Sequence, residues 1–291
     1  MTIVEIDLDA SLNYGMPVML HEGDFTCKTP LNVGDLDLFN SMTALPVPRP
    51  LDETTDSVLQ VLLARSLSLR LQVLGTSVTR IEDVQTRILE LEMYTQRLPP
   101  ELHSADPGST KNDLRQAFGI VSLDISLRRV LSYCYRSYIK DLTGPPPTTS
   151  LQNSLTILAY QKSFDPEIQG TDICKSEKYW DLFHILFKND VMQAALDVCF
   201  HARTKGLVSW TKASLLLAID DTIANLIRRI SRNGSDIKDV LRLSVISQLV
   251  KSQIMPGNRE EMMQDGAYKV LVACRKAREG EHTWEDSNVT A

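Results

Sequence analysis

The chain has 291 residues, a formal net charge of −6, 43% hydrophobic residues and 23% charged residues, the balance of an ordinary soluble globular protein. The first 56 residues hold ten acidic and two basic side chains, which argues against a nucleic-acid-binding surface there, because phosphate binding needs clustered Lys and Arg. No run of about 18 apolar residues is free of charges and no secretory signal is visible, so no membrane span is predicted.

Aromatic residues make up only 6% of the chain and leucine is abundant, which favours helices packed on helices. Residues 3–14 form the first predicted helix, which breaks at Gly15 and Pro17. Residues 20–56 then form a loop-rich acidic segment punctuated by Gly, Pro and Asn. Apolar side chains of this segment are expected to fasten it onto a helix: Phe25, Leu31, Val33, Leu36, Leu38 and Phe39.

Further helices are predicted between the Gly and Pro signals. They cover residues 52–75, 80–98, 113–142, 150–163, 177–204, 208–232, 236–254 and 258–278. The first carries apolar residues at alternate positions from Leu67 to Val73, a strand-like period, but its length and flanking cap residues favour a buried helix. The helix over 113–142 has two apolar faces, so it is expected to be a central element packed on both sides.

The predicted architecture is therefore all-α. It is an irregular multi-helix domain over residues 1–279, with the loop-rich segment 20–56 inside it and a polar tail over 280–291. No sequence repeat is visible, which disfavours a solenoid. The five cysteines are scattered and form no Cys-x-x-Cys pair, so buried free thiols in a reducing compartment are expected.

Asp220 and Asp221 are the first candidates for chemistry, because an aspartate pair on a helix can hold magnesium ions, as in terpene synthases. That pattern needs a further acid three or four residues on. Neutral residues follow instead, and then Arg228 and Arg229. These four side chains are expected to be surface charges on a solvated face, so no metal ligand is predicted among them.

Cys199 and His201 are the second candidates, but positions two apart on a helix do not face each other. Cys199 is expected in the core and His201 half-exposed. The remaining histidines are isolated in the sequence: His21, His103, His184 and His282. No nucleophile or phosphate-loop motif is present, so the residues alone predict no catalytic, cofactor-binding or metal-binding residue. By elimination they indicate an interaction or regulatory module.

The run from Ile3 to Leu20 resembles the fungal-specific transcription factor domain. This is the large helical regulatory region found downstream of a zinc binuclear-cluster DNA-binding domain. The positions that match the family's pattern are Glu5, Asp7, Ser11, Gly15 and Pro17.

Three later stretches extend the resemblance. Asp24-Phe25 and Pro30-Leu31-Asn32 are similar to the family's following loop, and Leu98-Pro-Pro-Glu-Leu102 to its helix stop. Residues 127–145 are similar to its central helix, but they end in Leu142-Thr-Gly-Pro145 instead of a Leu-His-Arg-Pro-like turn. These motifs cover residues 1–205, and the remainder matches by architecture only.

The resemblance implies a non-enzymatic transcriptional regulator in the nucleus, often of a secondary-metabolite gene cluster. It implies a protein partner or a dimer, with DNA reached only through a partner, because five scattered cysteines cannot form the family's six-cysteine zinc cluster. It also implies a small-molecule effector between helices. Since the family's domain begins upstream of the first helix here, the chain is expected to be an N-terminally truncated form of it.

Two alternatives stay open. One is a non-DNA-binding helical pathway protein or an enzyme on the same scaffold, which needs Asp220, Asp221 and a histidine, His184 or His201, to converge. The other is a non-functional remnant. It would expose an apolar scar on the first helix, formed by Ile3, Val4, Ile6 and Leu8.

Overall fold

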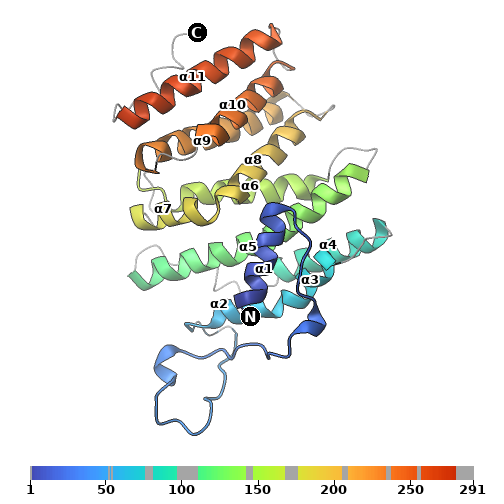
Figure 1. Cartoon of the computed structure of the whole chain (residues 1–291), viewed down its shortest axis with the longest axis vertical. Helices are drawn as coiled ribbons and strands as arrows, with labels where there is room; N and C mark the ends of the chain where they lie inside the picture. Colours follow the sequence, from blue (N-terminus) through green and yellow to red (C-terminus); the bar gives the residue numbers. More distant parts are fainter. Residues whose placement is uncertain are drawn as a thin grey trace. The chain divides into compact units, whose positions relative to one another are not determined.

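The computed structural model is all-α in the residues that it describes, as predicted (Figure 1). These are residues 2–51, 53, 55–75, 81–96, 111–141, 147–167, 176–204, 209–233, 237–253 and 257–279. They form two compact units, Met1–Thr143 with Pro166–Tyr179, and Gly144–Asp165 with Trp180–Ala291. The single domain over 1–279 stays a prediction, and the tail 280–291 lies outside the described residues.

The first unit holds the first five α-helices and two short 3₁₀ helices. Their bounds are α1 Thr2–Tyr14, η1 Glu22–Asp24, η2 Asp35–Asp37, α2 Val58–Arg65, α3 Leu67–Gly75, α4 Ile81–Gln96 and α5 Lys111–Asp141. In the rest of the chain the helices are α6 Thr148–Ser163, α7 Glu177–Leu186, α8 Lys188–Ala202, α9 Ser209–Asn233, α10 Ile237–Lys251 and α11 Arg259–Glu279. Within the described ranges, no helix is both long and apolar enough to span a bilayer.

Two of the predicted helices are wrong as single elements. The helix predicted over 52–75 begins only at Val58 and is divided at Ser66, whose hydroxyl donates to the Leu63 carbonyl over 2.8 Å. The helix predicted over 177–204 is divided at Phe187, whose side chain is buried. In both cases the interruption is one residue long, and backbone hydrogen bonds between residues four apart continue across it.

Helix α5 is the central element of the first unit. It packs against α2, α3 and α4, and it has buried apolar residues on both predicted faces, whereas Tyr138 and Leu142 lie outside the described side chains. One face includes Ile125 and Phe118, whose ring lies 5.2 Å from that of Tyr179. The other belongs to a core cluster of Val58, Leu62, Val73, Ile88, Leu91, Ile120, Leu123, Leu127, Val130, Leu131, Cys134 and Tyr135.

Helix α3 lies between that cluster and a second, smaller one. The smaller cluster joins Leu67 and Leu71 of α3 to Val4 and Leu8 of α1. This explains the strand-like alternation in the sequence, because a helix buried on two sides needs apolar residues almost all round. The predicted scar on α1 is therefore wrong for Val4 and Leu8, whereas Ile3 and Ile6 are exposed.

The second unit is built on α8, which packs against α6, α9 and α10, while α11 covers α9 and α10 (Figure 1). The apolar stripe on α9 is buried: Leu216, Ile219, Ile223, Leu226 and Ile230. Helices α10 and α11 approach closely at Gly266, where an added Cβ atom would lie 2.3 Å from Cγ of Gln248. The glycine thus allows the last helix to pack tightly.

The loop-rich segment 20–56 is not fastened by its apolar residues as predicted. Leu36 is 97% exposed, and Leu31, Leu38 and Phe39 are also exposed. Of the six residues named, Phe25 packs against the smaller cluster and Val33 is half-buried. Polar groups hold this loop instead, because its carbonyl and N–H groups need partners that apolar side chains cannot provide.

Asn32 is the centre of that polar framework and is 3% exposed. Its amide nitrogen lies 3.2, 2.5 and 3.2 Å from the carbonyl oxygens of Arg49, Pro50 and Glu53, and its amide oxygen accepts the Thr55 hydroxyl at 2.5 Å. Ser57, which precedes α2, accepts the N–H of Val33 and donates to main-chain carbonyls. The start of the loop is thereby tied to the chain that enters α2.

Replacement of Asn32 by alanine is expected to release this loop at a cost of about 2 kcal/mol, because several buried hydrogen bonds are lost together. Limited proteolysis should then cut the segment 31–57 faster, and urea unfolding should begin earlier. Asn40→Ala is the matched control, since Asn40 is exposed in the same loop. Equal cleavage of the two variants would show that Asn32 does not hold the loop.

Candidate functional site

The motif residues of α1 and of the turn that follows it form a connected structure. The side chain of Asp7 accepts the N–H groups of Met19 and Leu20, both at 3.0 Å. Ser11 donates toward the carbonyl of Asp7 at 2.7 Å or of Pro17 at 3.3 Å. Gly15 ends the helix with φ +66°, a conformation that favours glycine. Together these contacts fold the chain after α1 back along the helix.

Glu5 ties the same helix to α3. Its two carboxylate oxygens accept Nη1 of Arg70 at 2.7 Å and Nη2 at 2.5 Å. The Arg70 side chain is only 2% exposed, and it also donates to Ser66 and to the Leu63 carbonyl. A fork-to-fork pair of this kind fixes both distance and orientation. The motif positions therefore have a structural role, which is to fix the segment 16–22 against α1 and α3.

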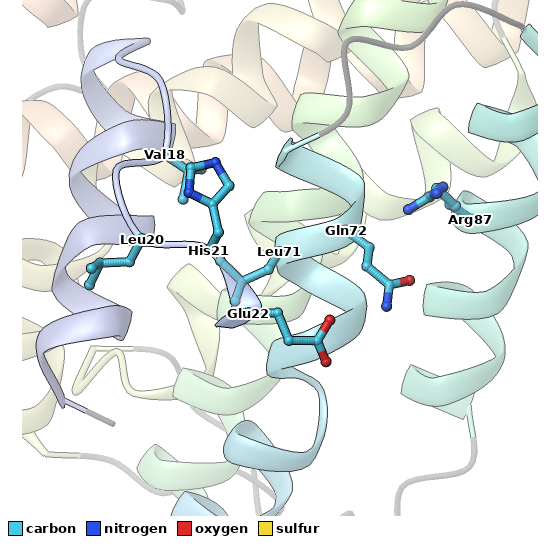
Figure 2. Close-up of a pocket in the computed structure, with 7 residues that line it drawn as sticks. All are labelled: Val18, Leu20, His21, Glu22, Leu71, Gln72 and Arg87. Carbon is cyan, nitrogen blue, oxygen red and sulfur yellow. The ribbon is translucent and has the colours of Figure 1, made fainter. Parts of the chain in front are cut away.

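A cavity of about 210 Å³ lies where this returning segment meets α3 and α4 (Figure 2). Val18, Leu20 and Leu71 give it an aliphatic wall that continues the smaller core cluster. Its polar lining consists of His21, Glu22, Gln72 and Arg87. The volume is below the roughly 300 Å³ at which pockets for drug-sized ligands begin, so the cavity suits a small metabolite.

The polar groups of the cavity differ in their partners. Glu22 accepts the Ser68 hydroxyl at 2.7 Å, and the Gln72 amide donates to the same hydroxyl oxygen at 3.1 Å. Figure 2 shows the side chain of Arg87 extending from α4 toward α3. Among the described residues none accepts a hydrogen bond from its Nη1, which is shielded from solvent. Arg87 is thus a cation at the wall of an aliphatic cavity.

Sequence reasoning missed this cavity, apart from expecting an effector between helices. Two lining residues were named there for other reasons: His21 as an isolated histidine and Leu20 as the end of the motif run. The lining residues lie in three separate segments of the sequence. Arg87, a basic residue next to the apolar stripe of α4, was the one signal available in the sequence. Only the fold brings these segments together.

The aspartate pair on α9 engages two different lysines. Asp220 pairs with Lys251 at 2.8 Å and Asp221 with Lys162 at 2.6 Å. The surface placement predicted for the arginines that follow is wrong: Arg229 is 6% exposed, and Arg228 pairs with the buried Asp165. The side chains that the structure describes include no group of three His, Cys, Asp or Glu that could hold a metal ion.

Cys199 is buried as predicted, but the half-exposed position predicted for His201 is wrong, because it is 4% exposed. Burial lowers the pKa of His201, whose Nε2 lies 3.4 Å from the Ser150 hydroxyl. His184 on α7 is fully buried, with its ring 4.6 Å from that of Trp180. His201 and His184 thus contact different residues. His103 and His282 lie outside the described residues.

The thiols differ sharply in their environment. Burial raises the pKa of Cys134 and of Cys199 to about 12 and that of Cys274 to about 11, whereas Cys27 is exposed. Since the thiolate is the reactive form, we expect a Cys174→Ser chain at pH 8 to show one fast thiol in a maleimide assay. Cys174 is replaced because it lies outside the described residues.

A further change, Cys27→Ser, should abolish that fast phase, and denaturant should then expose the three slow thiols together. Fast labelling that persists without Cys27 would contradict the burial of the other three.

The chain is similar to curated fungal transcription factors. It is 23% identical over 237 residues to the transcription factor phm2 of a Pyrenochaetopsis species. This alignment covers 77% of this chain and 31% of the relative. It is 24% identical over 208 residues to the pyrrolocin cluster transcription factor fsdR of a fungal species, covering 68% and 27%. It is 29% identical over 153 residues to the transcription factor opdR of Penicillium oxalicum, covering 47% and 18%.

The chain thus spans about a third or less of the length of these relatives. No protein-family model matches it. No solved structure matches it either.

Proposed function

We propose that the chain is a helical regulatory region of the kind found in fungal zinc-cluster transcription factors, and that it acts in the nucleus on a secondary-metabolite gene cluster. The similarity to phm2 over 237 residues carries this proposal, since it extends through both compact units. The name of fsdR, a cluster transcription factor, supports the metabolic context for that relative.

In this proposal the region has no enzymatic activity and meets DNA only through a protein partner, with which it forms a dimer or a larger assembly. The acidic start of the chain supports indirect DNA contact, because its charge repels phosphate. A small molecule in the cavity of Figure 2 is the effector. The structural role of Glu5, Asp7, Ser11 and Gly15 supports the zinc-cluster type, because these are the positions that match that family's regulatory domain.

A tethering experiment tests this function. Residues 1–291 are fused to an unrelated DNA-binding domain and expressed in a fungal host with a reporter gene that carries its binding sites. Wild-type fusion is expected to raise or lower reporter transcription relative to the DNA-binding domain alone. The control fusion carries Trp180→Asp, which breaks the core of the second unit. A wild-type fusion that matches both controls would count against a regulatory function.

The alternative of an enzyme on this scaffold is not proposed. It required Asp220 and Asp221 to converge with a buried histidine, and the two aspartates instead form separate ion pairs with lysines.

A further inference from the structure

We propose that the cavity between the segment 16–22, α3 and α4 binds a small aliphatic monocarboxylate, with Arg87 as the anchor for its carboxylate. This proposal names the chemical class of the effector, and its biological meaning rests on the proposed regulatory function. The binding itself is a property of the cavity and is tested without DNA.

The cation is the first argument. Arg87 forms no ion pair or hydrogen bond with another described residue, and its Nη1 is withdrawn from solvent. A guanidinium N–H group that loses water without gaining an acceptor is unfavourable, and a carboxylate offers two oxygens that fit the planar edge of the guanidinium. Two other arginines of this unit have such a partner, Arg70 in Glu5 and Arg128 in Asp124.

The aliphatic wall is the second argument. Leu71 is buried, and Val18 and Leu20 are half-buried around the opening. The methyl groups of these residues line the cavity and favour a short branched hydrocarbon group, which would complete the smaller core cluster at this point. A cavity of about 210 Å³ holds an acid of this size but has little room for a larger skeleton.

The rim limits the charge of the ligand. Glu22 lies at the cavity and its carboxylate is held there by the Ser68 hydroxyl, so it repels a second negative charge. A monoanion is therefore favoured over a dicarboxylate or a phosphate. The Glu22 carboxylate therefore also argues against a site that binds anions of any charge.

The test uses 4-methylpentanoate as the probe, with neutral 4-methylpentanamide as its isostere, and titrates the purified 291-residue chain by calorimetry and saturation-transfer NMR at low salt. The carboxylate is expected to bind and the amide to bind at least tenfold more weakly, since a hydrogen bond to a charged group is lost. Arg87→Gln should weaken carboxylate binding by about tenfold to a hundredfold and leave amide binding unchanged.

Glu22→Gln is the matched variant at the other charged residue of the lining. It keeps an oxygen for the Ser68 hydroxyl and removes the charge, so carboxylate binding should become about twofold tighter. Arg87→Lys keeps the charge and should bind the probe better than Arg87→Gln does. Circular dichroism establishes that each variant is folded, and opposite shifts at the two walls would not follow from a general loss of structure.

Absence of carboxylate binding to the wild-type chain, or equal binding by the amide, would overturn the proposal. So would an affinity that Arg87→Gln leaves unchanged. A chain that binds the probe but leaves the tethered reporter silent would refute the proposed function and not the site. A regulatory chain without probe binding would refute the site alone.

Discussion

Replacement of Arg228 by methionine is expected to lower the free energy of unfolding by about 3 kcal/mol, because it leaves a buried carboxylate without its cation. Arg228 pairs with Asp165, whose side chain is 2% exposed. Its guanidinium also lies 5.0 Å from the ring centroid of Trp180, which is buried in the same unit. The loss is measured by urea unfolding followed by circular dichroism.

The matched control is Lys162→Met. Lys162 pairs with Asp221, but their side chains are 50% and 40% exposed, so this change should cost less than about 1 kcal/mol. Arg228→Lys should fall between the two, since an ammonium keeps the charge but not the planar fork. If Arg228→Met and Lys162→Met cost the same, the buried pair does not stabilise this unit.

Arg228 and its neighbour Arg229 show which features of α9 could be predicted from the sequence and which could not. A cluster of basic residues near the end of a helix usually faces solvent, and that was the prediction for Arg228 and Arg229. Yet Arg229 follows Leu226 by three residues and so lies beside the buried stripe of α9. The periodicity of α9 therefore indicated that Arg229 is buried. The acidic partner of Arg228, Asp165, is 63 residues away and could not be identified from the sequence.

Helices were predictable because their apolar stripes and their Gly and Pro boundaries are local features. The breaks at Ser66 and Phe187 were not, since both interrupt continuous helix-forming runs. At each break a side chain contacts a residue four positions away: the Ser66 hydroxyl accepts from Arg70 of the next helix, and the Phe187 ring lies 5.4 Å from that of Phe183. Local propensity is a weak guide against such packing.

The loop and the cavity escaped prediction for a related reason. The partners of Asn32 lie 17 to 23 residues further along the chain, in a stretch whose composition indicates only a turn. The cavity likewise needs Val18, Leu71 and Arg87 to meet. The α1 motif was the useful signal, because its residues are close together in the sequence. Asp7 of this motif holds the segment that lines the cavity.

Replacement of Arg70 by methionine is expected to cost about 3 to 5 kcal/mol of unfolding free energy in the first unit. This change removes the bidentate pair with Glu5 and the two hydrogen bonds that Arg70 donates to the Ser66 hydroxyl oxygen and the Leu63 carbonyl. It should be visible as an earlier urea transition. Glu5→Leu should be costly as well, because it would leave Arg70, at 2% exposure, without its anion.

The double variant Glu5→Leu/Arg70→Met separates pairing from packing. With both charges gone, no unpaired ion remains buried, so the double variant should cost less than the two single changes added together. Arg49→Met is the external control, since Nη2 of Arg49 donates to both carboxylate oxygens of Asp37 but this arginine is 46% exposed. It should leave the unfolding midpoint almost unchanged.

Arg70 does not line the cavity, but it holds α1 and the returning segment against α3. Arg70→Met should therefore also weaken binding of the carboxylate probe under conditions where the chain is still folded. Additive single costs in the double variant, or full probe binding by Arg70→Met, would mean that the α1 motif neither stabilises the unit through this pair nor shapes the cavity.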